Sequence, residues 1–149
     1  MREVAEFIAV LASGLFTGAS LYINLVEHPA RMECGTELAA TEFPPSYRRA
    51  TIMQATLAAL GLLSSIAAWL GGAGLGWLVG GIFLGAVMPF TLVVILPTNK
   101  QLLSPTLDRR SAETGRLLVR WNALHSARSG LSSAALLLFL YLLVFTKPQ

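Results

Sequence analysis

Four long apolar segments constrain this chain more than any other feature of its sequence. A helix needs about 20 mostly apolar residues to cross a bilayer, and the segments at about 7–28, 51–71, 75–97 and 120–146 reach that length. None shows the strict polar–apolar alternation of a barrel strand, and in lipid a helix satisfies its own backbone polar groups. The sequence therefore predicts an all-α fold, an integral membrane four-helix bundle, formed by one transmembrane domain over residues 1–149.

The charged residues are few, and they lie beside the apolar segments. Only 13% of the residues are charged, against about 25% in a typical soluble domain. The net charge of +3 comes from basic residues next to the predicted spans, where they anchor a helix at a lipid surface. We therefore expect membrane lipid as a partner and no nucleic acid.

Basic residues also predict the orientation of the chain. The polar loops 29–50 and 98–119, together with the helix ends beside them, contain eight Lys and Arg residues, whereas the termini contribute only Arg2 and Lys147. The turn at Gly71–Gly74 contains none. By the positive-inside rule, both polar loops are predicted to be cytoplasmic and both termini to face outward. The acidic first residues and the long apolar run behind them are not typical of a cleavable signal peptide.

Proline, glycine and cysteine give further local predictions. Pro44-Pro45 is expected to break the first loop, Ser104-Pro105 to begin a short surface helix, and Pro89 to kink the third span. Glycines four apart, as at Gly76 and Gly80, predict close helix packing and make a homodimer plausible. The single cysteine, Cys34, excludes a dithiol relay.

Polar residues gather at one end of the predicted bundle, which is the most informative asymmetry in the sequence. At 100° per residue, Trp121, His125 and Arg128 share a stripe of the fourth helix. The apolar run behind Arg128 is too short to span alone, so His125 and Arg128 must enter the membrane, where such side chains face the protein interior. A purely structural role, with Arg128 pairing Glu27, is the alternative. The candidate residues are Asn24, Glu27, His28, Gln54, Asn99, Trp121, Asn122, His125 and Arg128.

Four short motifs, in this order, resemble the anthrone oxygenase-like family of small four-helix membrane proteins. They are Glu27–Pro29 closing the first helix, Tyr47–Ala50 before the second, Leu96–Lys100 closing the third and Trp121–Arg128 opening the fourth. The resemblance spans nearly the whole chain. It implies oxidation of a polycyclic phenolic anthrone to an anthraquinone with dioxygen. The expected function is that of a membrane-embedded oxidoreductase or monooxygenase that acts on a small apolar aromatic, anthrone- or quinone-like, at the cytoplasmic end of the bundle.

A mechanism consistent with that resemblance needs a base and an oxyanion site, with no metal strictly required. His125 is the first choice as base because imidazole transfers protons near neutral pH. Arg128 would stabilise the developing oxyanion. His28 and Glu27 would share or assist the base role. The remaining candidates would bind the substrate: Asn24, Gln54, Asn99 and Asn122 through hydrogen bonds, and Trp121 by stacking.

Two other function classes stay open from the residues. His28, His125 and Glu27 could ligate non-haem iron or copper, or the two histidines could hold a haem. The bundle could instead bind a lipid or quinone without catalysis, or serve as a subunit of a membrane complex. The sequence itself names no substrate.

Overall fold

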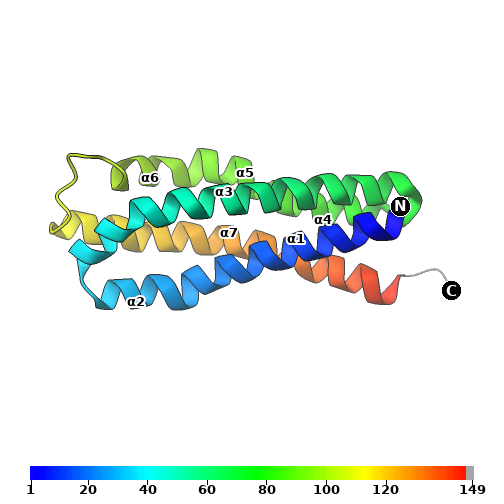
Figure 1. Ribbon diagram of the computed structural model, residues 1–149, viewed down its shortest axis with the longest axis horizontal. Coiled ribbons are helices and arrows are strands. Elements are labelled where there is room, and N and C mark those ends of the chain that lie inside the picture. The colour runs from blue at the N-terminus through cyan, green and yellow to red at the C-terminus, as the bar shows by residue number, and fades with distance from the viewer. Residues whose placement is uncertain (147–149) are drawn as a thin grey trace.

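The computed structural model describes residues 1–146 and forms four antiparallel helical rods (Figure 1). Each rod is long and apolar enough to cross a membrane: Arg2–Glu33, Thr36–Ala73, Leu75–Leu102 and Ala112–Phe145. Lys147, one of the two terminal cations of the orientation argument, lies outside the described residues. The helical bundle confirms the predicted all-α fold.

Three of the rods are divided into segments. The first consists of α1 (Arg2–Tyr22), η1 (Ile23–Glu27) and α2 (His28–Glu33), and the second of α3 (Thr36–Ala68) and η2 (Trp69–Ala73). The third consists of α4 (Leu75–Gly85), α5 (Val87–Phe90), η3 (Thr91–Ile95) and α6 (Leu96–Leu102). The fourth is the single helix α7 (Ala112–Phe145). Elements labelled η are wider π-helical turns.

The helices extend much further at the loop end than the sequence predicted. The expected polar loop 29–50 is almost entirely helical, with only Cys34 and Gly35 between α2 and α3. Gly35 makes this sharp reversal possible because its φ of 95° is open to glycine. The expected loop 98–119 shortens to residues 103–111. At 28 to 38 residues, the rods are about 42–57 Å long and project beyond a hydrocarbon core of about 30 Å.

Pro44-Pro45 does not break the chain as expected, because α3 continues through both residues. Each proline removes one backbone hydrogen bond, which costs roughly 3 kcal/mol in a helix interior. Packing of the same turns offsets that cost. Ala39, Ala40 and Phe43 are buried in a cluster with residues of α6 and α7, so tertiary contacts override local preference.

The helix start expected at Ser104-Pro105 is also wrong. Ser104 instead caps a turn, where its hydroxyl accepts a hydrogen bond from the Thr106 amide at 3.3 Å. The fourth rod begins at Ala112, and Ser111 caps it by accepting from the Thr114 amide. Both serines are suitable caps, but only Ser111 is followed directly by a long helix.

Two of the π-helical turns end two residues before a proline: η1 before Pro29 and η3 before Pro97. A proline cannot donate to the carbonyl four residues earlier and its ring crowds that carbonyl, so the preceding turn widens. Pro89 acts in a related way, since the third rod breaks at Ala86 between α4 and α5. Both proline-linked π-helical turns lie in the half of the bundle that carries the two loops (Figure 1).

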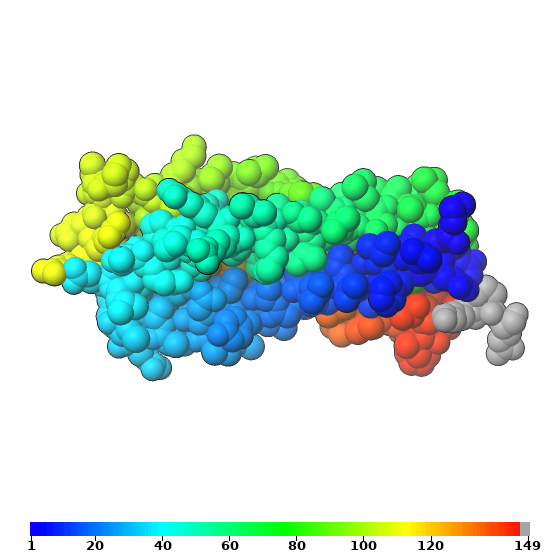
Figure 2. All heavy atoms as spheres, in the orientation of Figure 1, coloured from blue at the N-terminus to red at the C-terminus, as the bar shows by residue number. Residues whose placement is uncertain are grey.

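Three buried apolar clusters stack along the bundle. One, at the loop end, contains Phe43 and Trp121; a central one contains Phe16 and Leu84; the third, near the termini, contains Trp77 and Phe139. The surface in Figure 2 shows the resulting elongated molecule, with both loop segments at one end and the beginning of α1 and the end of α7 at the other.

Glycines of the third rod pack within the chain. A Cβ on Gly80 would lie 2.4 Å from the Phe139 ring, and one on Gly81 would lie 1.8 Å from the Ser65 hydroxyl. In α1, by contrast, a Cβ on Gly18 would meet nothing within 4 Å. Close packing therefore holds for the third rod, whose glycines bring α4 against α3 and α7 rather than facing a second copy.

Candidate active site

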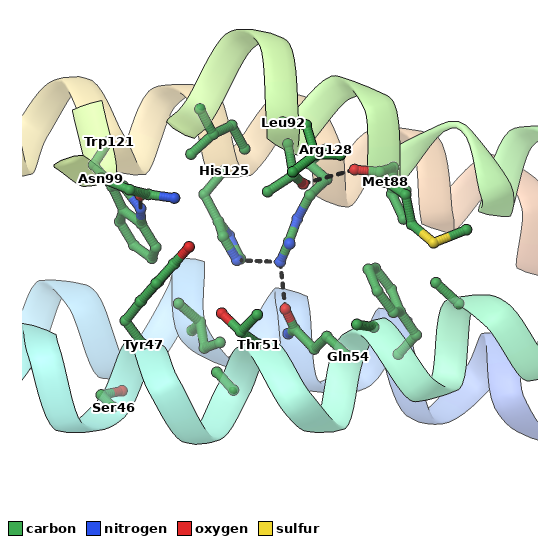
Figure 3. Close-up of a pocket in the computed structure, with 18 of the residues that line it drawn as sticks. Ser46, Tyr47, Thr51, Gln54, Met88, Leu92, Asn99, Trp121, His125 and Arg128 are labelled. Atoms are coloured by element: carbon green, nitrogen blue, oxygen red, sulfur yellow. Dashed lines mark hydrogen bonds between the residues drawn. The ribbon is translucent and has the colours of Figure 1, made fainter. Parts of the chain in front are cut away.

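A cavity of about 260 Å³ lies between the loop-end and central clusters (Figure 3). Its apolar walls come from both clusters, through Phe43, Ile95 and Trp121 on one side and Phe16 and Val87 on the other. A few polar side chains interrupt this apolar lining. An apolar pocket with a small number of placed polar groups is typical of small-molecule sites.

The cavity opens on the outer surface between α3 and η3. Thr51 and Ala55 of α3, together with Leu92 of η3, line the cavity and are also exposed. Beside this opening the outer surface is apolar, because Ile52 is 72% and Val93 73% exposed. The opening therefore lies on an apolar side of the bundle rather than at the loop end.

The polar side chains of the cavity lie further from the loop end than the exposed cations of α7 and α3. Arg128 follows the exposed Arg120 by eight residues of α7, which is about 12 Å along the helix, and Gln54 follows Arg49 by about 8 Å. This is the depth at which the sequence placed His125 and Arg128. Their side chains do face the interior, at 3% and 8% exposure.

His125, Arg128 and Gln54 form a connected polar line in the cavity wall (Figure 3). Arg128 Nη2 donates to His125 Nε2 at 2.7 Å and to Gln54 Oε1 at 2.5 Å. Three residues along a helix place His125 and Arg128 side by side, but α3 must approach α7 to bring in Gln54. Arg128 also lies over the Phe16 ring, 5.3 Å from its centroid.

Arg128 is a buried cation without a carboxylate partner. Among residues 1–146 it forms no salt bridge, and its buried Nε has no hydrogen-bond partner. The other arginine in the cavity wall, Arg31, is compensated by Glu27 and by Glu42 at 3.0 Å. The expected alternative pairing of Arg128 with Glu27 is therefore wrong, since Glu27 belongs to Arg31. An uncompensated buried cation is costly unless an anion approaches it.

Asn24, expected to bind substrate, instead lies behind His125 and does not line the cavity. Its Oδ1 accepts from His125 Nδ1 at 2.9 Å and from the Ser129 hydroxyl at 2.6 Å. Its amide nitrogen donates to Asn122 Oδ1 at 2.7 Å. Asn122 likewise lies outside the cavity wall, so both asparagines contact the site through other residues.

Asn99 and Tyr47 supply polar groups at the loop-end side of the cavity. Trp121 Nε1 donates to Asn99 Oδ1 at 2.8 Å, which turns the Asn99 amide nitrogen into the cavity (Figure 3). The Tyr47 hydroxyl points into the same space. Tyr47 was expected only as part of a motif. Its position seven residues before Gln54 places it on the same face of α3, and this spacing is the signal in the sequence that indicates its role.

His28 and Glu27 do not join this cavity wall. His28 is buried beside Trp121, with ring centroids 5.9 Å apart, and its Nδ1 has no partner among the described residues. Trp121 also stacks on His125, at 4.8 Å between centroids. Within residues 1–146, no three His, Cys, Asp or Glu side chains are grouped closely enough to hold a metal ion. The ligand set His28, His125 and Glu27 is therefore not assembled.

The fold defines a small multi-pass helical membrane protein with an internal cavity that has mostly apolar walls. Sequence comparison makes the class specific: a model of the anthrone oxygenase family matches residues 43–138. The chain belongs to this family. Three of the four motifs that carried the resemblance lie inside the matched range. It is 27% identical to the anthrone oxygenase tpcL of Aspergillus fumigatus over 136 residues, covering 85% of this chain and 84% of that protein. No solved structure matches the chain.

Proposed function

We propose that this protein is a membrane oxygenase that converts an anthrone-like aromatic into the corresponding quinone with dioxygen. The observation that carries the proposal is the buried His125–Arg128 pair in the wall of an apolar cavity that opens on an apolar side of the bundle. Family membership supports the reaction class, and the cavity supports the kind of substrate. Flat polycyclic phenols partition into lipid and fit a small apolar site that has a few hydrogen-bond donors.

The proposed reaction begins with proton removal from the substrate methylene. Arg128 donates a hydrogen bond to His125 Nε2. When a substrate oxygen replaces Nε2 as the acceptor of that hydrogen bond, Nε2 is free to accept the proton. The electron pair moves onto the substrate oxygen, and Arg128 stabilises the resulting oxyanion. The Nε of Arg128 has no hydrogen-bond partner among the described residues. It would provide a second donor to the same oxyanion.

Dioxygen then completes the reaction without another reductant. The electron-rich ring carbon bonds to one oxygen atom, and protonation gives a hydroperoxide. Removal of the second hydrogen on that carbon breaks the O–O bond and releases hydroxide, which leaves as water. One oxygen atom enters the quinone, the other becomes water, and all four electrons come from the substrate.

Asn99 and Tyr47 would orient the substrate. Both direct a donor into the cavity at some distance from Arg128 along its length (Figure 3). Hydrogen bonds to phenol or carbonyl oxygens at that end would place the reactive carbon at His125. Such positioning is itself a large part of catalysis.

The test is turnover of a hydroxylated anthrone by the protein in lipid nanodiscs, followed by oxygen uptake and quinone absorbance. With isotopically labelled dioxygen, the quinone should gain one labelled oxygen atom. His125→Gln should reduce the protein-dependent rate by about 100-fold or more, as loss of a general base does. Reactions without protein correct for spontaneous oxidation.

His28→Gln is the matched control because the chain has two histidines and His28 lies outside the cavity wall. It should leave the rate near that of the unaltered protein. Equal rates for the two variants would contradict the role of His125. Tight binding of the anthrone with no rate above the protein-free reaction would point instead to a non-catalytic binding protein.

A further inference from the structure

We infer that Asn24 is a positioning residue that fixes His125 in one tautomer, with Nε2 unprotonated and directed at the cavity. The kinetic part of this inference rests on the function proposed above. The structural part does not, because it concerns a hydrogen-bond chain within the protein. Each end of that chain meets a group that can only donate or only accept hydrogen bonds. These two groups fix the direction of the hydrogen bonds between them.

Arg128 fixes the cavity end. A guanidinium only donates hydrogen bonds, so the 2.7 Å contact between Arg128 Nη2 and His125 requires Nε2 to be the acceptor. A neutral imidazole with an accepting Nε2 carries its proton on Nδ1. The atom of Asn24 that lies 2.9 Å from Nδ1 must then be the amide oxygen.

Asn122 fixes the other end. The Asn24 amide nitrogen faces the Asn122 backbone carbonyl at 3.4 Å and the Asn122 side-chain oxygen at 2.7 Å. A backbone carbonyl only accepts, so the group facing it must be the nitrogen. The oxygen of the same amide then faces His125, which agrees with the conclusion reached from Arg128. Ser129 supports this orientation by donating to the amide oxygen at 2.6 Å.

The widened turn η1 holds Asn24 in this position. Asn24 is the second residue of η1, is only 9% exposed, and lies 101 residues before His125 in the chain. Pro29 follows the turn and prevents regular helical bonding there. Turns of this kind redirect single side chains and are frequent at functional sites.

The consequence for the site is that His125 Nε2 directs an unprotonated lone pair at the cavity. In the other tautomer Nε2 would carry the proton, oppose the donors of Arg128 and be unable to accept a proton from substrate. Asn24 therefore contributes to proton transfer without touching the substrate, in the way that the group behind a catalytic histidine selects its tautomer.

The test is nitrogen NMR of the imidazole ring in protein labelled at histidine. A His28→Gln background leaves His125 as the sole histidine. In that background, we expect the Nδ1 signal of a protonated nitrogen and the Nε2 signal of an unprotonated one. Arg128→Met in that background should keep the single tautomer, because Asn24 still accepts from Nδ1–H. Adding Asn24→Leu to Arg128→Met removes the partners at both ends of the ring and should produce a mixture of tautomers.

Turnover provides the second measurement. Asn24→Leu should lower kcat at least about tenfold with little change in KM, since the lone pair is lost but the cavity is not. A merely structural role would instead lower the stability of the Asn24→Leu protein and leave the tautomer of the Asn24→Leu, Arg128→Met protein unchanged.

An unprotonated Nδ1 in the His28→Gln protein would overturn the inference, and so would a single unchanged tautomer in a folded Asn24→Leu, Arg128→Met protein. If that protein does not fold, the NMR signals of the Arg128→Met protein still decide the question, because loss of the single tautomer there would assign its selection to Arg128 rather than to Asn24. A single tautomer that depends on Asn24, in a protein that never oxidises an anthrone, would uphold this inference and reject the proposed function.

Discussion

Two buried arginines in one cavity wall have opposite electrostatic surroundings. Arg31 is 6% exposed and pairs with two glutamates, whereas Arg128 is 8% exposed and contacts only neutral groups among the described residues. Removing the cation from a compensated site leaves unpaired carboxylates. Removing it from an uncompensated site takes away a cost.

This contrast predicts stability changes of different sign. Arg31→Met should lower the free energy of unfolding by about 2 kcal/mol, less than for a fully buried pair because Glu27 and Glu42 are partly exposed. Arg128→Met should leave the stability of the ligand-free protein unchanged or raise it, while weakening binding of a phenolate ligand at least about tenfold. Thermal unfolding in detergent and ligand titration measure the two quantities.

Arg120→Met is the control for these variants, because Arg120 is an exposed cation on the same helix as Arg128. Arg120→Met should change neither the free energy of unfolding nor the affinity for a phenolate ligand. A clear loss of stability for ligand-free Arg128→Met would mean that the protein already compensates this charge, and would remove the argument for an anionic ligand.

At the scale of the elements, the departures from regular helix shape the site. The break at Ala86 and the widened turn η3 lie in the part of the third rod that lines the cavity. Along α4, close glycine contacts hold the third rod against α3. Beyond Ala86 that contact is replaced by the cavity and its opening between α3 and η3. Prolines, which the interior of a soluble helix would avoid, are therefore located where the third rod separates from α3.

The opening predicts a route for the ligand. Ala55→Trp should fill the gap between α3 and η3 and slow association of a hydroxyanthraquinone about tenfold or more, since the indole adds a large apolar group at the entrance. Stopped-flow fluorescence in nanodiscs measures this rate. Thermal unfolding should be nearly unaffected because Ala55 is exposed.

Ile52→Trp is the matched control one turn away. Ile52 is 72% exposed and does not line the cavity, so a tryptophan there should leave the association rate unchanged. Equal rates for the two variants would show that the ligand enters elsewhere, for example from the loop end.

At the scale of the whole molecule, polar residues are concentrated at one end of the bundle. The loop end carries the connections 34–35 and 103–111 and the basic residues in and beside them, and the cavity lies in that half. The sequence predicts this end to be cytoplasmic. A substrate that enters from lipid would then react inside the cavity, near the cytoplasmic face.

Cys34 allows a direct test of that orientation. It is the single cysteine, it is exposed, and it lies between α2 and α3 at the loop end. A membrane-impermeant maleimide should label Cys34 only after intact cells are opened. In a Cys34→Ser, Gly72→Cys protein, the hairpin turn at the opposite end should be labelled without opening the cells. The reverse pattern would invert the orientation and leave the fold unchanged.

The sequence by itself determined the number of spans, the helical fold and the end at which polar residues gather. Those properties depend on hydropathy and length, which are local. It also placed His125 and Arg128 together on the interior face, because a spacing of three residues fixes one face of a helix.

Only the tertiary structure decided which partners those residues meet. Asn24 lies behind His125 rather than in the cavity, and Glu27 compensates Arg31 rather than Arg128. The passage of α3 through Pro44-Pro45 depends likewise on burial of the surrounding turns. The physical reason is common to all three: local spacing fixes the face on which a side chain lies, whereas its partner is set by how separate helices pack.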